Sequence, residues 1–323
     1  MRRPLIALAS FALVLSTGSS ANAAIPTCPT PPADAVAVAP AQADFVVAAQ
    51  LPKLDAQPAG ERVLGLAALD LQLGEWLRLR QACFAPDQAG SIQALSVAGD
   101  AQGEFVWLLR GEGVSSEGSV ACVSDWFARR DEGKLPWLEV QTLGGECVRH
   151  YRSASPRKMA AVAMQNHTLA LVSAGWFDGV LAALEDGQLR AVDLEEAAKL
   201  ARHPDAQIWG AGTLHRKAGY LAQVPWRDTI RNLAMRAELS DGMSVRMAAE
   251  TSDFASALTQ AVASELPRLF ARWVELGVPK RLLAKLEVSK AGELFLARWE
   301  LDGGDLRQLA NSLRGVLQGG GLL

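Results

Sequence analysis

The four cysteines are the residues of this sequence whose type and spacing point most directly to chemistry. Successive cysteines are 55, 39 and 25 residues apart, so there is no C-x-x-C pair. This pattern argues against a zinc site, which needs closely spaced ligands. In an oxidising compartment an even number of cysteines predicts two disulfides, with three connectivities open. The four residues are Cys28, Cys83, Cys122 and Cys147.

Ser155 and Lys158 match the S-x-x-K pattern of penicillin-interacting enzymes. In those enzymes the lysine lies one helical turn from the serine, so that it can reach the hydroxyl. Pro156 favours a turn between strands instead, no S-x-N box follows, and Lys217-Ala218-Gly219 is only a partial match to the third motif. We therefore interpret this segment as a turn.

The histidines show neither an H-x-x-x-H nor an H-E-x-x-H spacing, and the chain has no G-x-S-x-G elbow. A Ser–His–acid triad can still be assembled from residues that are far apart in sequence. A serine-type hydrolase is therefore kept as an alternative. The candidates for its base are His150, His167, His203 and His215.

Two glycine-rich segments resemble ligand loops without completing the pattern. Gly210-Ala211-Gly212 lacks the third glycine and the opening helix of a dinucleotide site, so close backbone packing is the better interpretation. Asp302-Gly303-Gly304-Asp305 has too few oxygen ligands in register for a cation loop and favours a turn with a helix N-cap. The sequence thus predicts no catalytic, cofactor-binding or metal-binding residue.

Nine tryptophans against two tyrosines is an unusual ratio. Three of them fall in expected strands at core-like positions and three near expected turns, where an exposed trio could bind sugar rings or a partner. Core filling is the favoured interpretation. The strand group is Trp107, Trp209 and Trp299, and the turn group is Trp137, Trp176 and Trp226.

Residues 1–24 have the layout of a signal peptide. Arg2 and Arg3 precede an apolar run, Pro4 to Leu15, and a small-residue stretch ends at Ala24. The run is too short to span a bilayer, so no transmembrane anchor is expected after cleavage. Met1 and Pro4 fit the twin-arginine motif poorly, and Ile25-Pro26-Thr27 before Cys28 fits a lipoprotein site poorly. The sequence predicts a periplasmic or secreted protein.

The charge balance excludes one class of partner. The chain carries 32 basic and 35 acidic residues, a formal net charge of −3, and no basic block interrupts this balance. Nucleic-acid binding therefore has no electrostatic support. The expected partner is an unknown protein or another envelope component.

The periodicity predicts an α+β fold of two similar units, each an antiparallel sheet packed on helices. Residues 25–43 are rich in Pro and Ala and are expected to be an extended lead-in, with ordered structure from Asp44. Unit one covers 44–187 and contains all cysteines but Cys28; unit two covers 188–323 and has none.

Unit one is expected to contain a helix over 61–84, a hairpin over 92–111 turning at Asp100 to Gly103, and a helix over 119–130. Strands then follow from 137 to 172, before a helix over 176–185.

Unit two is expected to open with a helix N-capped by Asp193, followed by a strand over 207–214. A hairpin over 231–250 turns at Asp241-Gly242, where glycine would supply a positive φ. A helix from Thr251 or Ser252, a second hairpin turning at Lys290 to Gly292, and a helix over 305–318 complete the unit.

Both units read as strand, hairpin, helix, strand pair and helix, which predicts an internal duplication with the 61–84 helix as an insertion. The pattern resembles a loose group of exported bacterial proteins of unknown function that pair two α+β units. In that group a cysteine after the first helix, here Cys83, accompanies an Arg-Gly at the hairpin end, here Arg110-Gly111, and a helix cysteine, here Cys122. The resemblance implies a Cys83–Cys122 disulfide and leaves Cys28 for Cys147.

These observations together favour an exported, non-catalytic binding or assembly protein of the cell envelope. An envelope hydrolase whose triad is assembled between the two units is the alternative. No cofactor is expected for either function.

Overall fold

The computed structural model describes residues 28, 30–67, 71–84, 92–130, 137–143, 147–153, 159–164, 167–186, 191–213, 230–251, 271, 274–275 and 277–318. Several sequence-based expectations lie outside these residues. They are the signal peptide, the Ser155–Lys158 and Lys217–Gly219 segments, His215, Trp226 and Ser252, one of the two expected caps of a helix; the other, Thr251, is the last residue of a strand.

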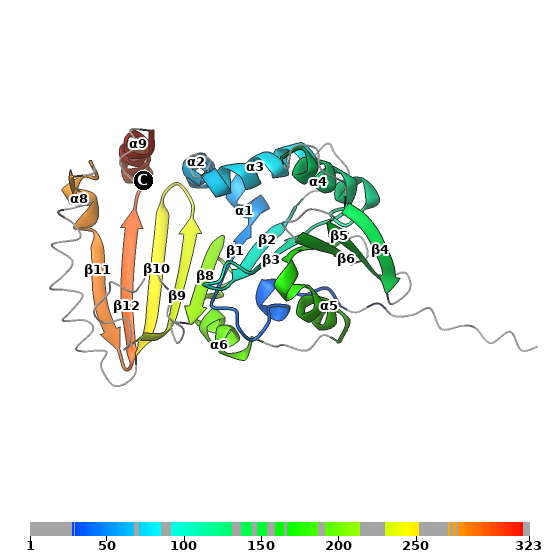
Figure 1. Cartoon of the computed structure of the whole chain (residues 1–323). Coiled ribbons are helices and arrows are strands. Elements are labelled where there is room, and N and C mark those ends of the chain that lie inside the picture. The colour runs from blue at the N-terminus through cyan, green and yellow to red at the C-terminus, as the bar shows by residue number, and fades with distance from the viewer. Residues whose placement is uncertain are drawn as a thin grey trace, which may run out of the picture.

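The described strands form one twelve-stranded sheet in which every neighbouring pair is antiparallel (Figure 1). Their order across the sheet is β11-β12-β10-β9-β8-β1-β2-β3-β7-β6-β5-β4. The strands are β1 (Phe45–Gln50), β2 (Ala94–Gly99), β3 (Phe105–Arg110), β4 (Trp137–Leu143), β5 (Val148–Ser153), β6 (Met159–Met164), β7 (Thr168–Ser173), β8 (Ile208–Thr213), β9 (Ile230–Leu239), β10 (Met243–Thr251), β11 (Leu286–Ala291) and β12 (Leu294–Leu301).

Helices lie on both sides of this sheet, so the expected α+β class is confirmed (Figure 1). Along β3, Val106 and Leu108 belong to the core shared with α5 and α6, whereas Leu109 belongs to the core shared with α4. The helical elements are η1 (Ala35–Ala37), α1 (Leu51–Asp55), α2 (Pro58–Ala67), α3 (Leu71–Cys83), α4 (Glu117–Arg130), η2 (Ala174–Trp176), α5 (Phe177–Asp186), α6 (Val192–Ala201), α8 (Lys280–Leu283) and α9 (Gly303–Gln318). None of the described helices combines the length and apolar character needed to cross a bilayer.

The two expected units share the sheet through β1 and β8, which pair antiparallel at its centre. Read outward from this pair, the strand order is β1-β2-β3-β7-β6 on one side and β8-β9-β10-β12-β11 on the other. The two successions correspond element by element, and β5 and β4 extend only the first. An internal duplication stays a hypothesis, to which this correspondence adds support.

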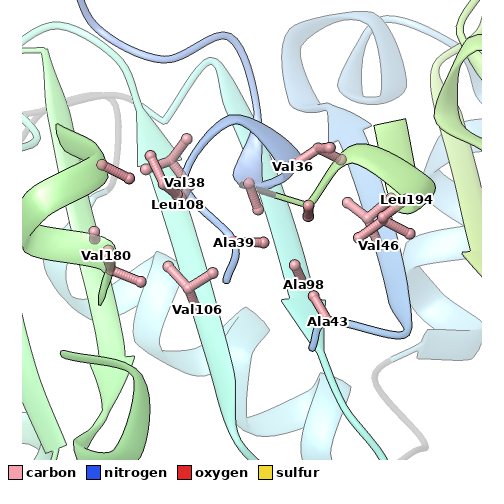
Figure 2. Close-up of a cluster of buried hydrophobic side chains, with 14 of the residues drawn as sticks. Val36, Val38, Ala39, Ala43, Val46, Ala98, Val106, Leu108, Val180 and Leu194 are labelled. Atoms are coloured by element: carbon pink, nitrogen blue, oxygen red, sulfur yellow. The ribbon is translucent and has the colours of Figure 1, made fainter. Parts of the chain in front are cut away.

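Ordered structure begins earlier than the expected Asp44. Residues 35–39 form η1 and its C-terminal end, and Ala35, Val36, Val38 and Ala39 are 0–1% exposed. Figure 2 shows Val36, Val38 and Ala39 packed against the sheet, near Leu108 of β3, Val46 of β1 and Leu194 of α6. These small apolar side chains lose little rotamer entropy on burial, and they cover sheet surface that would otherwise meet water. This part of the lead-in is therefore core, not a tether.

Both disulfides belong to the first expected unit and its lead-in. Cys83 at the end of α3 is bonded to Cys122 of α4, with Cα atoms 5.6 Å apart. Cys28 is bonded to Cys147 directly before β5, with Cα atoms 5.3 Å apart. This is the pairing that the resemblance implied. Cys147 precedes an internal strand of the sheet, so the lead-in is held at a strand end and not along a sheet edge.

Three local expectations are corrected. The helix expected over 61–84 is two helices, α2 and α3. Asp193 lies in the first turn of α6, whose N-cap is Ala191 without a side-chain bond. Gly242 turns the β9–β10 hairpin without a positive φ. Glycine is required there because a Cβ would lie 2.1 Å from the Leu301 carbonyl oxygen. Close backbone approach, rather than φ, determines the residue.

Candidate ligand pocket

A pocket of about 640 Å³ lies where the two expected units meet. Its walls come from β1, β2, β3 and β8, from the start of α1, from the loop after α6 and from the ordered lead-in. Its volume is within the range of small-molecule sites. Segments far apart in sequence therefore build one concave surface at the centre of the sheet.

The floor of the pocket is a row of cross-strand neighbours on one face of the sheet. In register, Ala48 of β1 stands between Trp209 of β8 and Ser96 of β2, and Ser96 stands beside Leu108 of β3. Because strand side chains alternate between faces, the next row on this face contains Gln50, Ala94 and Arg110.

The hollow follows from the small side chains in these two rows. Ala48 and Ala94 stand between larger neighbours, and a longer side chain at either position would extend into the space above the sheet. Both are ordinary residues for a strand pattern, so no sequence signal marks them as site residues.

The ordered lead-in forms one wall. The Ala35 amide donates a hydrogen bond to the Ser96 hydroxyl at 2.8 Å, and Arg110 donates through Nη1 to the Ala33 carbonyl at 2.8 Å. Asp34 N-caps η1, since its Oδ1 accepts from the Val36 amide at 3.0 Å. Specific hydrogen bonds therefore join this wall to the floor.

The loop after α6 forms the opposite wall. Arg202 donates through Nε and Nη2 to the two carboxylate oxygens of Asp34, each at 3.1 Å, and through Nη1 to Glu195 at 2.5 Å. Its guanidinium lies 5.3 Å from the ring centroid of Trp209, which is a cation–π distance. Arg202 thus holds the lead-in against α6 and the sheet.

Burial dominates the electrostatics of Asp34. Desolvation raises the pKa of its carboxyl, and the positive charge of Arg202 offsets only part of that effect. For Arg202 burial lowers the pKa, but its bonds to Glu195 and Asp34 outweigh this and the net shift is upward. Both pKa values are therefore raised, that of Asp34 by burial and that of Arg202 by its carboxylate partners; the Asp34 side chain is 10% exposed and that of Arg202 is 32% exposed.

Two further cations line the pocket, and backbone carbonyl groups hold them. Lys53 of α1 donates through Nζ to the Pro204 carbonyl at 2.8 Å, as Arg110 does to Ala33. In the described part of the chain neither Lys53 nor Arg110 has a carboxylate within ion-pair distance. A carbonyl orients a cation without neutralising it, so the lining carries uncompensated positive charge.

His203 lines this pocket, but its contacts are not those of a triad base. Its Nδ1 accepts a hydrogen bond from the Asp205 amide at 3.3 Å, whereas a triad histidine donates from this nitrogen to a carboxylate. The carboxylates of Asp205 and Glu238 lie 3.7 and 3.9 Å away. Among the described residues no hydroxyl forms a hydrogen bond with His203.

The other described histidines lie outside the pocket. His150 is 4% exposed in β5, with its ring edge-on to Phe177 at 5.7 Å between centroids. His167 is exposed in the turn before β7. The structure therefore brings no two of the candidate bases together in its described part.

A second hollow, of about 720 Å³, is rich in acids. Five carboxylate residues line it against one basic residue, Lys285. Within the described ranges no group of three His, Cys, Asp or Glu side chains is arranged to hold a metal ion. The acidic residues are Asp205, Glu238, Asp241, Glu300 and Asp302.

Asp302 acts as a helix cap, as expected for the Asp302–Asp305 segment. Its Oδ1 accepts from the Gly304 and Asp305 amides at 2.8 Å each, at the start of α9. These backbone bonds lower the pKa of its carboxyl.

The structure also tests the expectations for the Gly210-Ala211-Gly212 segment and for the tryptophans. A Cβ on Gly210 would lie 3.3 Å from the Val46 carbonyl oxygen of β1, and one on Gly212 would lie 3.2 Å from the Asp44 carbonyl oxygen directly before β1, which agrees with close backbone packing in β8. Trp176 and Trp209 are 2% and 6% exposed, and Trp299 donates through its indole N–H to the Leu282 carbonyl at 2.7 Å. Of the turn group, Trp176 is therefore a core residue.

Comparisons with known proteins identify no family. No protein-family model matches the chain, and no curated protein matches it. Among solved structures, a crystal structure of TP0453 aligns with a TM-score of 0.45 and 11% sequence identity, covering 87% of this chain and 96% of that one.

Proposed function

We propose that this protein is a non-catalytic binding protein of the cell envelope, periplasmic or secreted, and that the pocket between its two units is the ligand site. The observation that carries the proposal is the pocket itself. Its walls are held in place by a bidentate ion pair and by backbone hydrogen bonds. Such a preformed, mainly apolar hollow with a few placed polar groups is typical of a ligand site.

Two further features support this function over the hydrolase. The imidazole that lines the pocket accepts a backbone hydrogen bond at the nitrogen that a triad base would use as a donor. The two disulfides fit a protein that folds in an oxidising compartment, as the signal peptide expected over residues 1–24 requires.

The test uses the full chain produced with its own leader in a Gram-negative host. Native mass spectrometry of protein from the periplasm or medium should reveal a co-purified small molecule, and N-terminal sequencing should find cleavage after Ala23 or Ala24. Ala94→Leu would fill the floor of the pocket and should abolish the co-purified mass. Ala291→Leu, at an exposed alanine of β11, is the matched control and should retain it.

Two results would contradict the proposal. The first is a bound mass that is unchanged in Ala94→Leu. The second is turnover of an ester, peptide, glycan or phosphate substrate that disappears in His203→Gln.

A further inference from the structure

The charges of the pocket restrict what it can hold. Lys53 and Arg110 both line it, and each is fixed by a hydrogen bond to a backbone carbonyl, of Pro204 and Ala33 respectively. Fixing a cation in this way removes its rotational freedom before a ligand arrives. Neither cation has a carboxylate partner in the described part of the chain, so the positive charge is both ordered and available.

Asp34 is the acidic residue among the described lining residues, and it does not cancel this charge. Both of its carboxylate oxygens accept from Arg202, which also binds Glu195. The pocket therefore has beside it an ion-pair network of one cation and two carboxylates, and Lys53 and Arg110 have no carboxylate partner, which leaves one positive charge in excess. This local excess occurs in a chain whose formal net charge is −3, so it is a property of the site and not of the whole surface.

The remaining lining is mainly apolar, with Gln50, Gln93, Ser96 and His203 as its polar members. Ala48, Ala94 and Leu108 lie on the pocket face of the strands, and Pro52 and Pro204 add to the apolar part. Arg110 and Gln50 are two strand spacings apart in register, which is about 10 Å, and Lys53 follows Gln50 by three residues. Both cations line the same pocket, and side chains as long as those of Lys and Arg can converge on one group above the floor from backbone positions about 10 Å apart.

We propose that the pocket selects small organic anions, whose carboxylate, phosphate or sulfonate group is bound by Lys53 and Arg110 and whose apolar body rests on Ala48 and Ala94. This rests on the proposed function, since it names the ligand class of the same site. Charge-assisted hydrogen bonds to an oxyanion are stronger than neutral ones, and they are strengthened further where the apolar lining excludes water.

The test compares two fluorescent probes with the same aromatic skeleton on the mature full chain. Anilinonaphthalene sulfonate carries one negative charge, and phenylnaphthylamine carries none. We expect the sulfonate to bind with one-to-one stoichiometry and more tightly than the neutral probe. Lys53→Gln and Arg110→Gln should each weaken the binding of the sulfonate by about ten- to a hundredfold, the size of one charge-assisted hydrogen bond, and leave the affinity for the neutral probe within about twofold.

Matched variants separate charge from structure. Lys53→Arg and Arg110→Lys keep the charge and should keep most of the affinity for the sulfonate. Lys290→Gln removes an exposed lysine from β11, outside the pocket, and should change nothing. Ala94→Leu should weaken the binding of both probes, because the larger side chain fills the space that both occupy.

The outcomes distinguish the two proposals. Suppose that Ala94→Leu weakens the binding of both probes, whereas the charge variants weaken both equally or weaken neither. Anion selection is then wrong, and the pocket remains a binding site. If the sulfonate fails to bind, or binds equally well to Ala94→Leu, both the anion selection and the assignment of the pocket as the ligand site are wrong.

Discussion

Arg202 binds both carboxylate oxygens of Asp34 although the two residues are 168 positions apart in sequence. Asp34 belongs to the lead-in that packs as η1, and Arg202 follows the last residue of α6. Their pair joins the N-terminal segment to the second expected unit and forms part of the pocket wall. The anchoring of the lead-in and the shape of the pocket therefore depend on the same contact.

Arg202→Met should destabilise the protein by about 2–3 kcal/mol, because it leaves the largely buried Asp34 carboxylate without its cation. This range lies below that of a fully buried pair, since the Arg202 side chain is 32% exposed. Urea unfolding followed by tryptophan fluorescence measures the change. The double variant with Asp34→Asn should recover part of the loss. A double variant that loses the sum of both single effects would show that the pair has no coupling.

The raised pKa of Asp34 predicts a pH dependence with a definite sign. From about pH 4 upward the folded state retains a proton on this carboxyl that the unfolded chain releases. Asp34 therefore contributes stability at low pH that is lost as the pH rises through its raised pKa. Asp34→Asn does not titrate and keeps an oxygen to accept from the Val36 amide.

The free energy of unfolding of the native protein, minus that of Asp34→Asn, should accordingly fall as the pH rises from about 4 through the raised pKa of Asp34. Urea titrations in a series of buffers at constant ionic strength measure this difference. A difference that rises with pH would mean that the charged Asp34–Arg202 pair outweighs burial.

The Cys28–Cys147 disulfide should stabilise the protein more than the Cys83–Cys122 disulfide does. It closes a loop with a sequence separation of 119, for which the loop-entropy model gives about 5 kcal/mol, against about 4 kcal/mol for the separation of 39 between Cys83 and Cys122. Replacing each pair by serines in turn, with urea unfolding, tests this order. Equal losses, or a larger loss for the shorter loop, would contradict it.

Hydrogen exchange should locate the effect of each disulfide. Without Cys28–Cys147 the amides of residues 35–39 should lose protection first, because that cross-link holds the lead-in from its N-terminal side. Full reduction should destabilise residues 44–187 more than 188–323, since the cross-links lie in the first unit and its lead-in. Uniform loss of protection across both units would contradict this expectation.

Gly242→Ala should destabilise the β9–β10 hairpin by about 1–3 kcal/mol, because the new methyl group would meet the Leu301 carbonyl and Asp302 Cα. Gly65→Ala is the control. It lies exposed in α2 with nothing within 4 Å of its Cβ position, so alanine should stabilise the helix by about 0.5–1 kcal/mol. Thermal unfolding compares the two. A neutral Gly242→Ala would show that the turn can move away from β12.

Much of the local structure was determined by the sequence itself. The 94–110 hairpin turns at Gly103 with φ +86°, and its Asp100 accepts from the Gln102 and Glu104 amides, as a turn at Asp100 to Gly103 predicts. The strands from 137 to 173, the helix at α4 and the cap of α9 also follow from patterns that span a few residues. Such patterns report local backbone preference and alternation of side chains, which the sequence carries directly.

The position and the lining of the pocket are determined by the tertiary structure alone. Ala48, Ser96, Leu108 and Trp209 come from four separate strands and become neighbours only through strand order and register. The lead-in was expected to be extended because its composition is rich in Pro and Ala, yet it packs on the sheet face between α5 and α6. Which surface a segment covers, and which distant charge it meets, depends on the assembled sheet, because burial and ion pairing act between residues that the sequence keeps far apart.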